Sequence, residues 1–190
     1  MSIPLLSKSK FVAGIQCPLR LWYQCYEPEL ATPPTPAQQA IFDMGTRVGE
    51  LARDLYPGGA LIEEDHLQHD EAIGCTGEAL NDASIPAIYE AAFTSDGVRI
   101  RADILERTGN GSWNLMEVKS GVQARDHHFQ DAAVQYHVLS GLGLDIEKAG
   151  ILHLNNKYVY DGHKLNLEEL FTFDDLTTQI LDEQTEVSRK

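Results

Sequence analysis

The chain has 190 residues, enough for one domain whose hydrophobic core needs no disulfide bonds. Its 29 acidic residues outnumber its 15 basic residues, and the formal net charge of −14 argues against a protein that holds nucleic acid mainly by bulk positive charge. The sequence shows neither a signal-peptide pattern nor an apolar run approaching about 18 residues. We therefore expect a cytoplasmic protein without a membrane partner.

Residues 1–35 are predicted to form an N-terminal helical segment that precedes the main domain. Ser7 or Ser9 is expected to cap a short helix, and Pro18 to end that helix or begin a second one. The prolines within residues 28–36 then indicate an extended connection.

A helix is predicted over residues 36–55, because apolar residues recur there at helical spacing and form one stripe. The residues of this stripe are Ile41, Met44, Val48, Leu51 and Leu55. The sequence Pro57-Gly58-Gly59 ends the helix, and a further helix is expected around residues 70–81.

Three antiparallel strands are predicted next, over residues 87–94, 98–106 and 113–119. The Asp96-Gly97 dipeptide favours a hairpin between the first two, and a glycine-containing turn follows the second. Side chains alternate along the second strand. We expect Val98, Ile100, Ala102 and Ile104 on one face, and Arg99, Arg101 and Asp103 on the other.

The remaining elements complete a mixed sheet. A helix is predicted over residues 125–142, a short strand over 149–154 and a last helix over 173–186. The order of helix, three antiparallel strands, helix and strand predicts an α/β fold in which helices flank a mixed sheet.

Charged residues on two of these strands form the pattern that indicates chemistry. Glu117 and Lys119 face the same way, and hairpin pairing can bring Asp103 of the neighbouring strand close to Glu117. Two close carboxylates suit Mg²⁺ or Mn²⁺, which lowers the pKa of a bound water, and an adjacent lysine can orient that water or stabilise a charged phosphate. The set predicts phosphodiester hydrolysis. The alternative is three surface charges on the open face of a sheet.

Several strings of the sequence resemble a known family. RADIL at residues 101–105, WNLMEVKSG at residues 113–121 and the following helix with Gln135 and Tyr136 are similar to the RecB-like branch of the PD-(D/E)XK nucleases. The opening SKSKFVAGIQCPLRLWY resembles the start of the Fe–S-containing CRISPR adaptation nucleases and of a family of larger, uncharacterised bacterial proteins.

The resemblance extends over residues 5–172. It implies a restriction-endonuclease-like core over residues 36–172, followed by a C-terminal helix over residues 173–190 that is truncated. The chain would then be the N-terminal, nuclease-like part of a longer protein. The substrate that the resemblance implies is DNA that is single-stranded or has free ends.

The family's motifs also imply roles for individual residues. Asp103 and Glu117 would bind the metal ion, with the Val118 carbonyl as a third ligand. Lys119 would be the catalytic lysine. Gln135, which lies one helical turn from Asp131, would contact the substrate or position the lysine region.

The chain departs from the family in its predicted first long helix. Many RecB-like nucleases have a Gly-x-x-x-His pattern there, but this chain has Gly45 followed by Gly49, so the histidine is absent. The adjacent Glu50 is the candidate for the last metal ligand. Its position away from the apolar stripe favours a solvated residue instead. Family members also often have a glutamate where this chain has Glu90, for which we expect a hydrogen-bonding role.

The cysteines do not match the family's cluster. Cys17 corresponds to the first of four cysteines that bind a [4Fe–4S] cluster, but the other three follow the nuclease core in the family and none occurs here after Cys75. We therefore do not predict a [4Fe–4S] cluster unless a further C-terminal segment completes it. The alternative for Cys17 is a small buried apolar residue.

Three functions remain open at this stage. The first is a DNA nuclease that uses Mg²⁺ or Mn²⁺. The second is a catalytically weak nuclease fold that binds nucleic acid or docks a partner protein, which the missing histidine and the negative charge favour. The third is an Fe–S-dependent scaffold that needs a further C-terminal domain.

Overall fold

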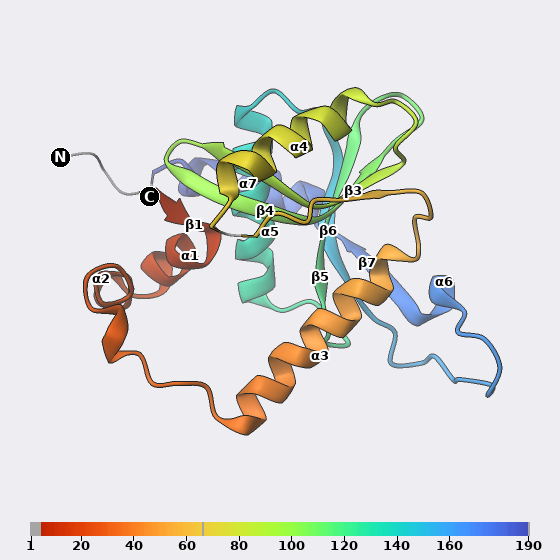
Figure 1. Ribbon diagram of the computed structural model, residues 1–190, viewed down its shortest axis with the longest axis horizontal. Helices are drawn as coiled ribbons and strands as arrows, with labels where there is room; N and C mark the ends of the chain where they lie inside the picture. The colour runs from red at the N-terminus through yellow and green to blue at the C-terminus, as the bar shows by residue number, and fades with distance from the viewer. Residues whose placement is uncertain (1–4, 66, 190) are drawn as a thin grey trace.

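The computed structural model describes residues 5–65 and 67–189 (Figure 1). Its elements in chain order are β1 Leu6–Ser7, α1 Lys8–Gln16, α2 Pro18–Tyr26, the 3-10 helix η1 Pro28–Leu30, α3 Pro36–Arg53, β2 Ala60–Leu61, α4 His69–Asn81, β3 Ala87–Ser95, β4 Val98–Arg107, β5 Trp113–Lys119, α5 Asp126–Gly141, β6 Ile146–Leu154, α6 Leu167–Leu170, β7 Phe171–Asp175 and α7 Thr177–Val187. None of the helices in the described ranges is both long and apolar enough to cross a membrane.

A seven-stranded mixed sheet forms the centre of the molecule. Its strand order is β2-β3-β4-β5-β6-β7, and β1 pairs with the start of β4. Strands β3, β4 and β5 are antiparallel neighbours, whereas β5 and β6 are parallel and are joined by α5, because parallel strands need a crossover connection. The predicted α/β fold, with three antiparallel strands followed by a helix and a strand, is confirmed.

Helices cover both faces of this sheet, and each face has its own core. Helices α1, α4, α5 and α7 pack on one face, where Ile100 and Leu139 are among the buried residues. Helix α3 packs on the other face, where Val48 contacts a smaller core that includes Met116. Figure 1 shows that α3 runs obliquely away from the sheet and that α1 and α2 lie at a distance from α3. The end of β5 therefore lies between α1, α3 and α5.

The alternation of side chains breaks in the middle of β3 and β4. Val98 and Ala102 belong to the core under α4 and α5, but Ile104 belongs to the core under α3, so the prediction that they share one face is wrong. The break coincides with Glu90, which has a φ of 55° and lies opposite Asp103 in the register. A non-glycine residue adopts this conformation at a cost of roughly 1–3 kcal/mol, and such irregularities re-aim side chains beside functional sites.

Helix α3 is packed against the sheet only in its second half. Val48 is buried, but Ile41 and Met44 are 64% and 57% exposed, so only part of the predicted stripe packs. The first turns extend beyond the sheet (Figure 1), where a capping box between Thr35 and Gln38 stabilises the helix start without tertiary contacts.

The C-terminal end contains a strand that the sequence analysis missed. Residues 171–175 form β7, which pairs with β6, so the last helix begins at Thr177 and not at residue 173. The predicted boundary between residues 172 and 173 is wrong because it falls inside β7. The strand has only five residues, too few for its alternation to stand out in the sequence.

The N-terminal segment is tied directly to the core. Ser7 caps α1 and Pro18 begins α2, so the predicted pair of helices is confirmed. The Leu6 N–H donates to the Gly97 carbonyl at 2.9 Å where β1 joins β4. Helix α1 therefore starts beside the strand that carries Asp103.

Candidate active site

The two predicted carboxylates meet where β4 and β5 part. The paired ladder of these strands ends at Ile104 and Met116. Beyond it, the Asp103 carboxylate accepts a hydrogen bond from the Val118 N–H at 2.7 Å. This contact holds Asp103 beside β5, next to the buried side chain of Glu117. The structure therefore brings Asp103, Glu117 and Val118 together, with Val118 contacting Asp103 through its N–H.

Glu117 is surrounded by donors on both carboxylate oxygens. The Lys119 ammonium lies 2.7 Å from Oε1, the Lys8 ammonium lies 2.8 Å from Oε1 and 2.9 Å from Oε2, and the Gln135 amide donates to Oε2. Burial alone would raise the pKa of Glu117, but Lys8 and Lys119 outweigh that effect and lower it to about 2. Glu117 is therefore charged at every physiological pH.

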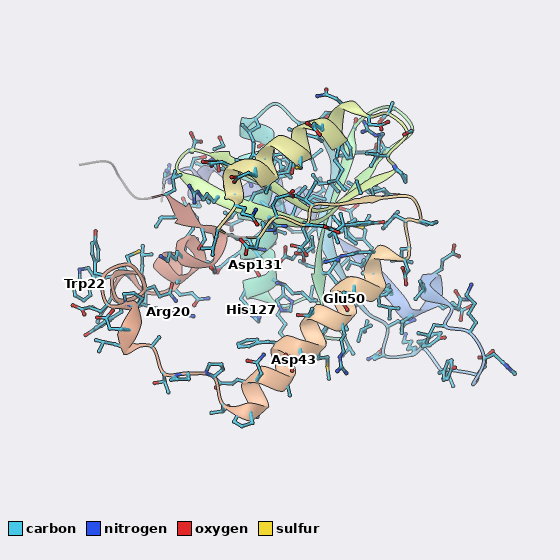
Figure 2. All side chains as sticks on the ribbon, in the orientation of Figure 1. Arg20, Trp22, Asp43, Glu50, His127 and Asp131 are labelled. Carbon is cyan, nitrogen blue, oxygen red and sulfur yellow. The ribbon has the colours of Figure 1, made fainter. Side chains whose placement is uncertain are left out.

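Helix α5 fixes the lysine and the glutamate from one side. Asp131, which Figure 2 labels on this helix, accepts from the Lys119 ammonium at 2.8 Å. Gln135 reaches Glu117 and also donates to the Asp131 carbonyl at 3.2 Å. Burial would lower the pKa of Lys119, but Glu117 and Asp131 outweigh it and raise that pKa. Gln135 therefore lies near the lysine, as expected. Because Asp131 is one helical turn before Gln135, it faces the same site and contacts Lys119.

A cavity of about 360 Å³ opens in front of these groups. Its lining comprises Gly45, Thr46, Gly49 and Arg53 of α3, Glu90 of β3, Asp103 of β4, and residues 117–120. A Cβ atom added at Gly45 or Gly49 would meet nothing within 4 Å, so the glycine face of α3 leaves this space open. The position at which the family has a histidine, Gly49 here, therefore faces the site.

Glu90 lies on the same cavity but is already paired. Arg53 of α3 contacts it at 3.2 Å and Arg101 of β4 at 3.4 Å. Arg101 also donates to the Ile62 carbonyl at 2.9 Å. Glu90 therefore ties α3 to the sheet beside Asp103, which is the hydrogen-bonding role expected for it.

Asp103 is the electrostatically strained member of the site. Burial, followed by the negative charge of Glu117, raises its pKa to about 7, although Lys8 and the Val118 N–H act in the opposite direction. A carboxyl group with a raised pKa in the folded state binds its proton more tightly than in the unfolded chain. The contribution of Asp103 to stability therefore falls as pH rises from about 4 through 7.

Replacing this carboxyl should stabilise the protein. We expect Asp103→Asn to raise the unfolding free energy by about 1–3 kcal/mol at pH 8 and by less at pH 5, because asparagine carries no charge to bury. Urea unfolding at both pH values measures this difference. Asp182→Asn on the exposed side of α7 is the control and should change stability by less than about 0.5 kcal/mol. The same change in unfolding free energy at both pH values, whether a gain or a loss, would show that the charge of Asp103 is not strained.

The donor set fits a hard divalent cation. Asp103 and Glu117 offer carboxylate oxygens, and the negative charge of Glu117 adds to the effect of burial in raising the pKa of Asp103. Mg²⁺ is commonly bound through one or two carboxylates and keeps several waters. Within residues 5–65 and 67–189, no group of three or more His, Cys, Asp or Glu side chains is placed to hold a metal. Water or substrate oxygens would therefore have to complete the coordination shell.

Two other predicted site residues lie elsewhere. Glu50 is exposed on α3 (Figure 2), and its helix turns Gly49 and Arg53 toward the cavity, so the prediction of Glu50 as a metal ligand is not supported. Cys17 is exposed between α1 and α2, beside an apolar groove of about 780 Å³, so it is not the buried apolar residue considered above. Cys25 and Cys75 are also free thiols.

Comparisons with known proteins identify no family for this chain. No protein-family model and no curated protein matches the sequence. One similar solved structure is described as "Crystal structure of SSO0001", with 12% identity and a TM-score of 0.43. The match covers 98% of this chain and 78% of the other. At this level of similarity the comparison carries no argument about function.

Proposed function

We propose that the protein is a metal-dependent nuclease that hydrolyses DNA phosphodiester bonds in the cytoplasm, as its resemblance to the RecB-like PD-(D/E)XK nucleases implies. The observation that supports this best is the meeting of Asp103, Glu117 and Lys119 on the lining of one cavity. Acidic ligands for a cation and a fixed ammonium group are the parts that phosphodiester hydrolysis needs. DNA that is single-stranded or has free ends is the proposed substrate.

Each residue of the site has a distinct task in this proposal. Asp103 and Glu117 would hold Mg²⁺ or Mn²⁺, which supplies a water of lowered pKa when bound. Lys119 stays protonated because its pKa is raised, so it stabilises negative charge and orients water but does not accept a proton. Asp131 fixes the position of the ammonium, and Gln135 fixes the orientation of the Glu117 carboxylate.

The experiment that tests the proposal measures cleavage of end-labelled single-stranded DNA with Mn²⁺. We expect cleavage that EDTA abolishes and that Glu117→Gln lowers by at least about 100-fold, because glutamine keeps the shape but not the charge that binds the cation. Glu168→Gln, an exposed glutamate on α6, is the matched control and should keep full activity. Circular dichroism confirms that both variants are folded. Cleavage by Glu117→Gln at the wild-type rate would refute the proposed site.

A second function is favoured by one specific observation. Gly49 stands on the cavity where the resemblance leads us to expect an imidazole ligand, and the third carboxylate of the lining, Glu90, is already paired with Arg53 and Arg101. Such a site could bind DNA or a partner protein without cutting. Mn²⁺-independent DNA binding with no cleavage over a full time course would favour this second function over the first.

A further inference from the structure

Lys8 reaches the candidate site from the start of α1, 109 residues before Glu117 in the sequence. Its ammonium lies 2.8 Å from one carboxylate oxygen of Glu117 and 2.9 Å from the other. A cation placed almost evenly between both oxygens occupies the side of the carboxylate at which a bidentate ligand meets a metal ion. Lys8 and Glu117 share no sequence pattern that indicates this contact.

The contact uses the last coordination positions of Glu117. One oxygen receives Lys8 and Lys119, and the other receives Lys8 and Gln135. A carboxylate has about four lone-pair sites, so these four contacts saturate it. Lys119 is also held by Asp131, and Gln135 by a backbone carbonyl, which leaves Lys8 as the partner with the fewest other ties.

We propose that Lys8 is a built-in cation that competes with the divalent ion for Glu117 and so sets the affinity of the site for metal. A divalent ion coordinated by Glu117 displaces the Lys8 ammonium toward a second pocket, of about 520 Å³, that Lys8 and Asp103 both line. The inference rests on the proposed function only in assuming that Asp103 and Glu117 bind a divalent cation.

The surroundings of Lys8 allow this exchange without unfolding. Helix α1 itself is fixed, because Val12 and Ala13 are buried in the core and Ser7 caps its first turn. The Lys8 side chain is 20% exposed, and its flexible four-carbon stem can swing outward while the backbone stays in place. The exchange therefore needs a rotamer change only.

The local charges explain why the two cations compete. The charged cluster at the site has three carboxylates, which are the candidate ligands Asp103 and Glu117 together with Asp131. Its two cations are the ammonium groups of Lys8 and Lys119. The nearby Glu90 is already neutralised by two arginines. With Lys8 in contact, two ammonium groups face three carboxylates, so much of the negative charge that would attract a divalent ion is already offset. Without Lys8 the cluster carries one more net negative charge, and its attraction for a divalent ion rises.

The test compares Mn²⁺ binding by calorimetry in EDTA-treated, dialysed protein. We expect Lys8→Gln, which keeps a hydrogen-bond donor but loses the charge, to bind Mn²⁺ at least about tenfold more tightly than the wild type. Lys8→Arg keeps the charge and should bind as the wild type does. Lys10→Gln, on the same helix, is the matched control and should leave the affinity unchanged. The double variant Lys8→Gln with Glu117→Gln should lose the tight site.

The possible results separate this inference from the proposed function. Equal Mn²⁺ affinity in the wild type and Lys8→Gln, with binding that still depends on Glu117, overturns the role of Lys8 and leaves the metal site standing. Absence of Mn²⁺ binding in both proteins overturns both. If Lys8→Gln is folded but too unstable for calorimetry, melting with and without Mn²⁺ replaces it. Mn²⁺ must then raise its Tm more than that of the wild type, and an equal or smaller rise overturns the inference.

Discussion

Lys119→Met should lower the rate of Mn²⁺-dependent DNA cleavage by roughly 10²–10⁴-fold without weakening Mn²⁺ binding. The ammonium lies 2.7 Å from Glu117 and 2.8 Å from Asp131, so it is held in place and ready to stabilise charge at the phosphate. Methionine has a similar length but no charge. Because the lysine is a cation and not a metal ligand, its loss removes stabilisation of the transition state without removing a ligand.

Two measurements separate this loss from misfolding. Single-turnover cleavage gives the rate, and calorimetry gives the Mn²⁺ affinity of the same preparation. Lys148→Met, an exposed lysine on β6, is the matched control and should cleave at the wild-type rate. A Lys119→Met variant that cleaves normally, or that loses rate only because it no longer binds Mn²⁺, would assign the chemistry to other residues.

Gly49→His should tighten Mn²⁺ binding by about tenfold or more, since one further ligand worth about 1.4 kcal/mol changes the affinity by that factor. Gly49 faces the cavity that Asp103 and Glu117 line, and an added Cβ atom meets nothing within 4 Å. A histidine is also a better helix former than glycine, so α3 should tolerate it. The gain in affinity should be accompanied by faster cleavage at low Mn²⁺ concentration.

The control for this gain is Gly49→Ala. It also replaces the glycine by a better helix former and adds the same Cβ atom but no ligand atom, so its Mn²⁺ affinity should equal that of the wild type. Binding by both variants is compared at one pH above 7, where imidazole is neutral. If histidine and alanine at this position give the same affinity, α3 does not supply the site with a ligand position.

The parts of the fold that depend on local pattern could be predicted from the sequence. Strands β3 to β5 follow from alternation and from the Asp96-Gly97 turn, and their antiparallel pairing brings Asp103 beside Glu117. The face shared by Glu117 and Lys119 follows from their spacing of two residues. These features need only neighbouring segments to pair.

The parts that depend on distant contacts could not be predicted. Lys8 reads as one more charge in a polar N-terminal stretch, and only the pairing of β1 with β4 brings it to Glu117. The left-handed conformation of Glu90 leaves no mark in the residue type, although it coincides with the break in alternation that puts Ile104 on the other face. Helix propensity likewise does not show that the first half of α3 extends past the sheet.

The most direct test of the account is a crystal structure of the protein soaked with Mn²⁺, with the ion located by its anomalous scattering. The account predicts one ion that shares oxygens of Asp103 and Glu117, with the Lys8 ammonium moved away from Glu117 and Lys119 still on Asp131. An ion bound elsewhere, or carboxylates that do not share it, would contradict the proposed site. An ion at both carboxylates with Lys8 still on Glu117 would contradict the competition alone.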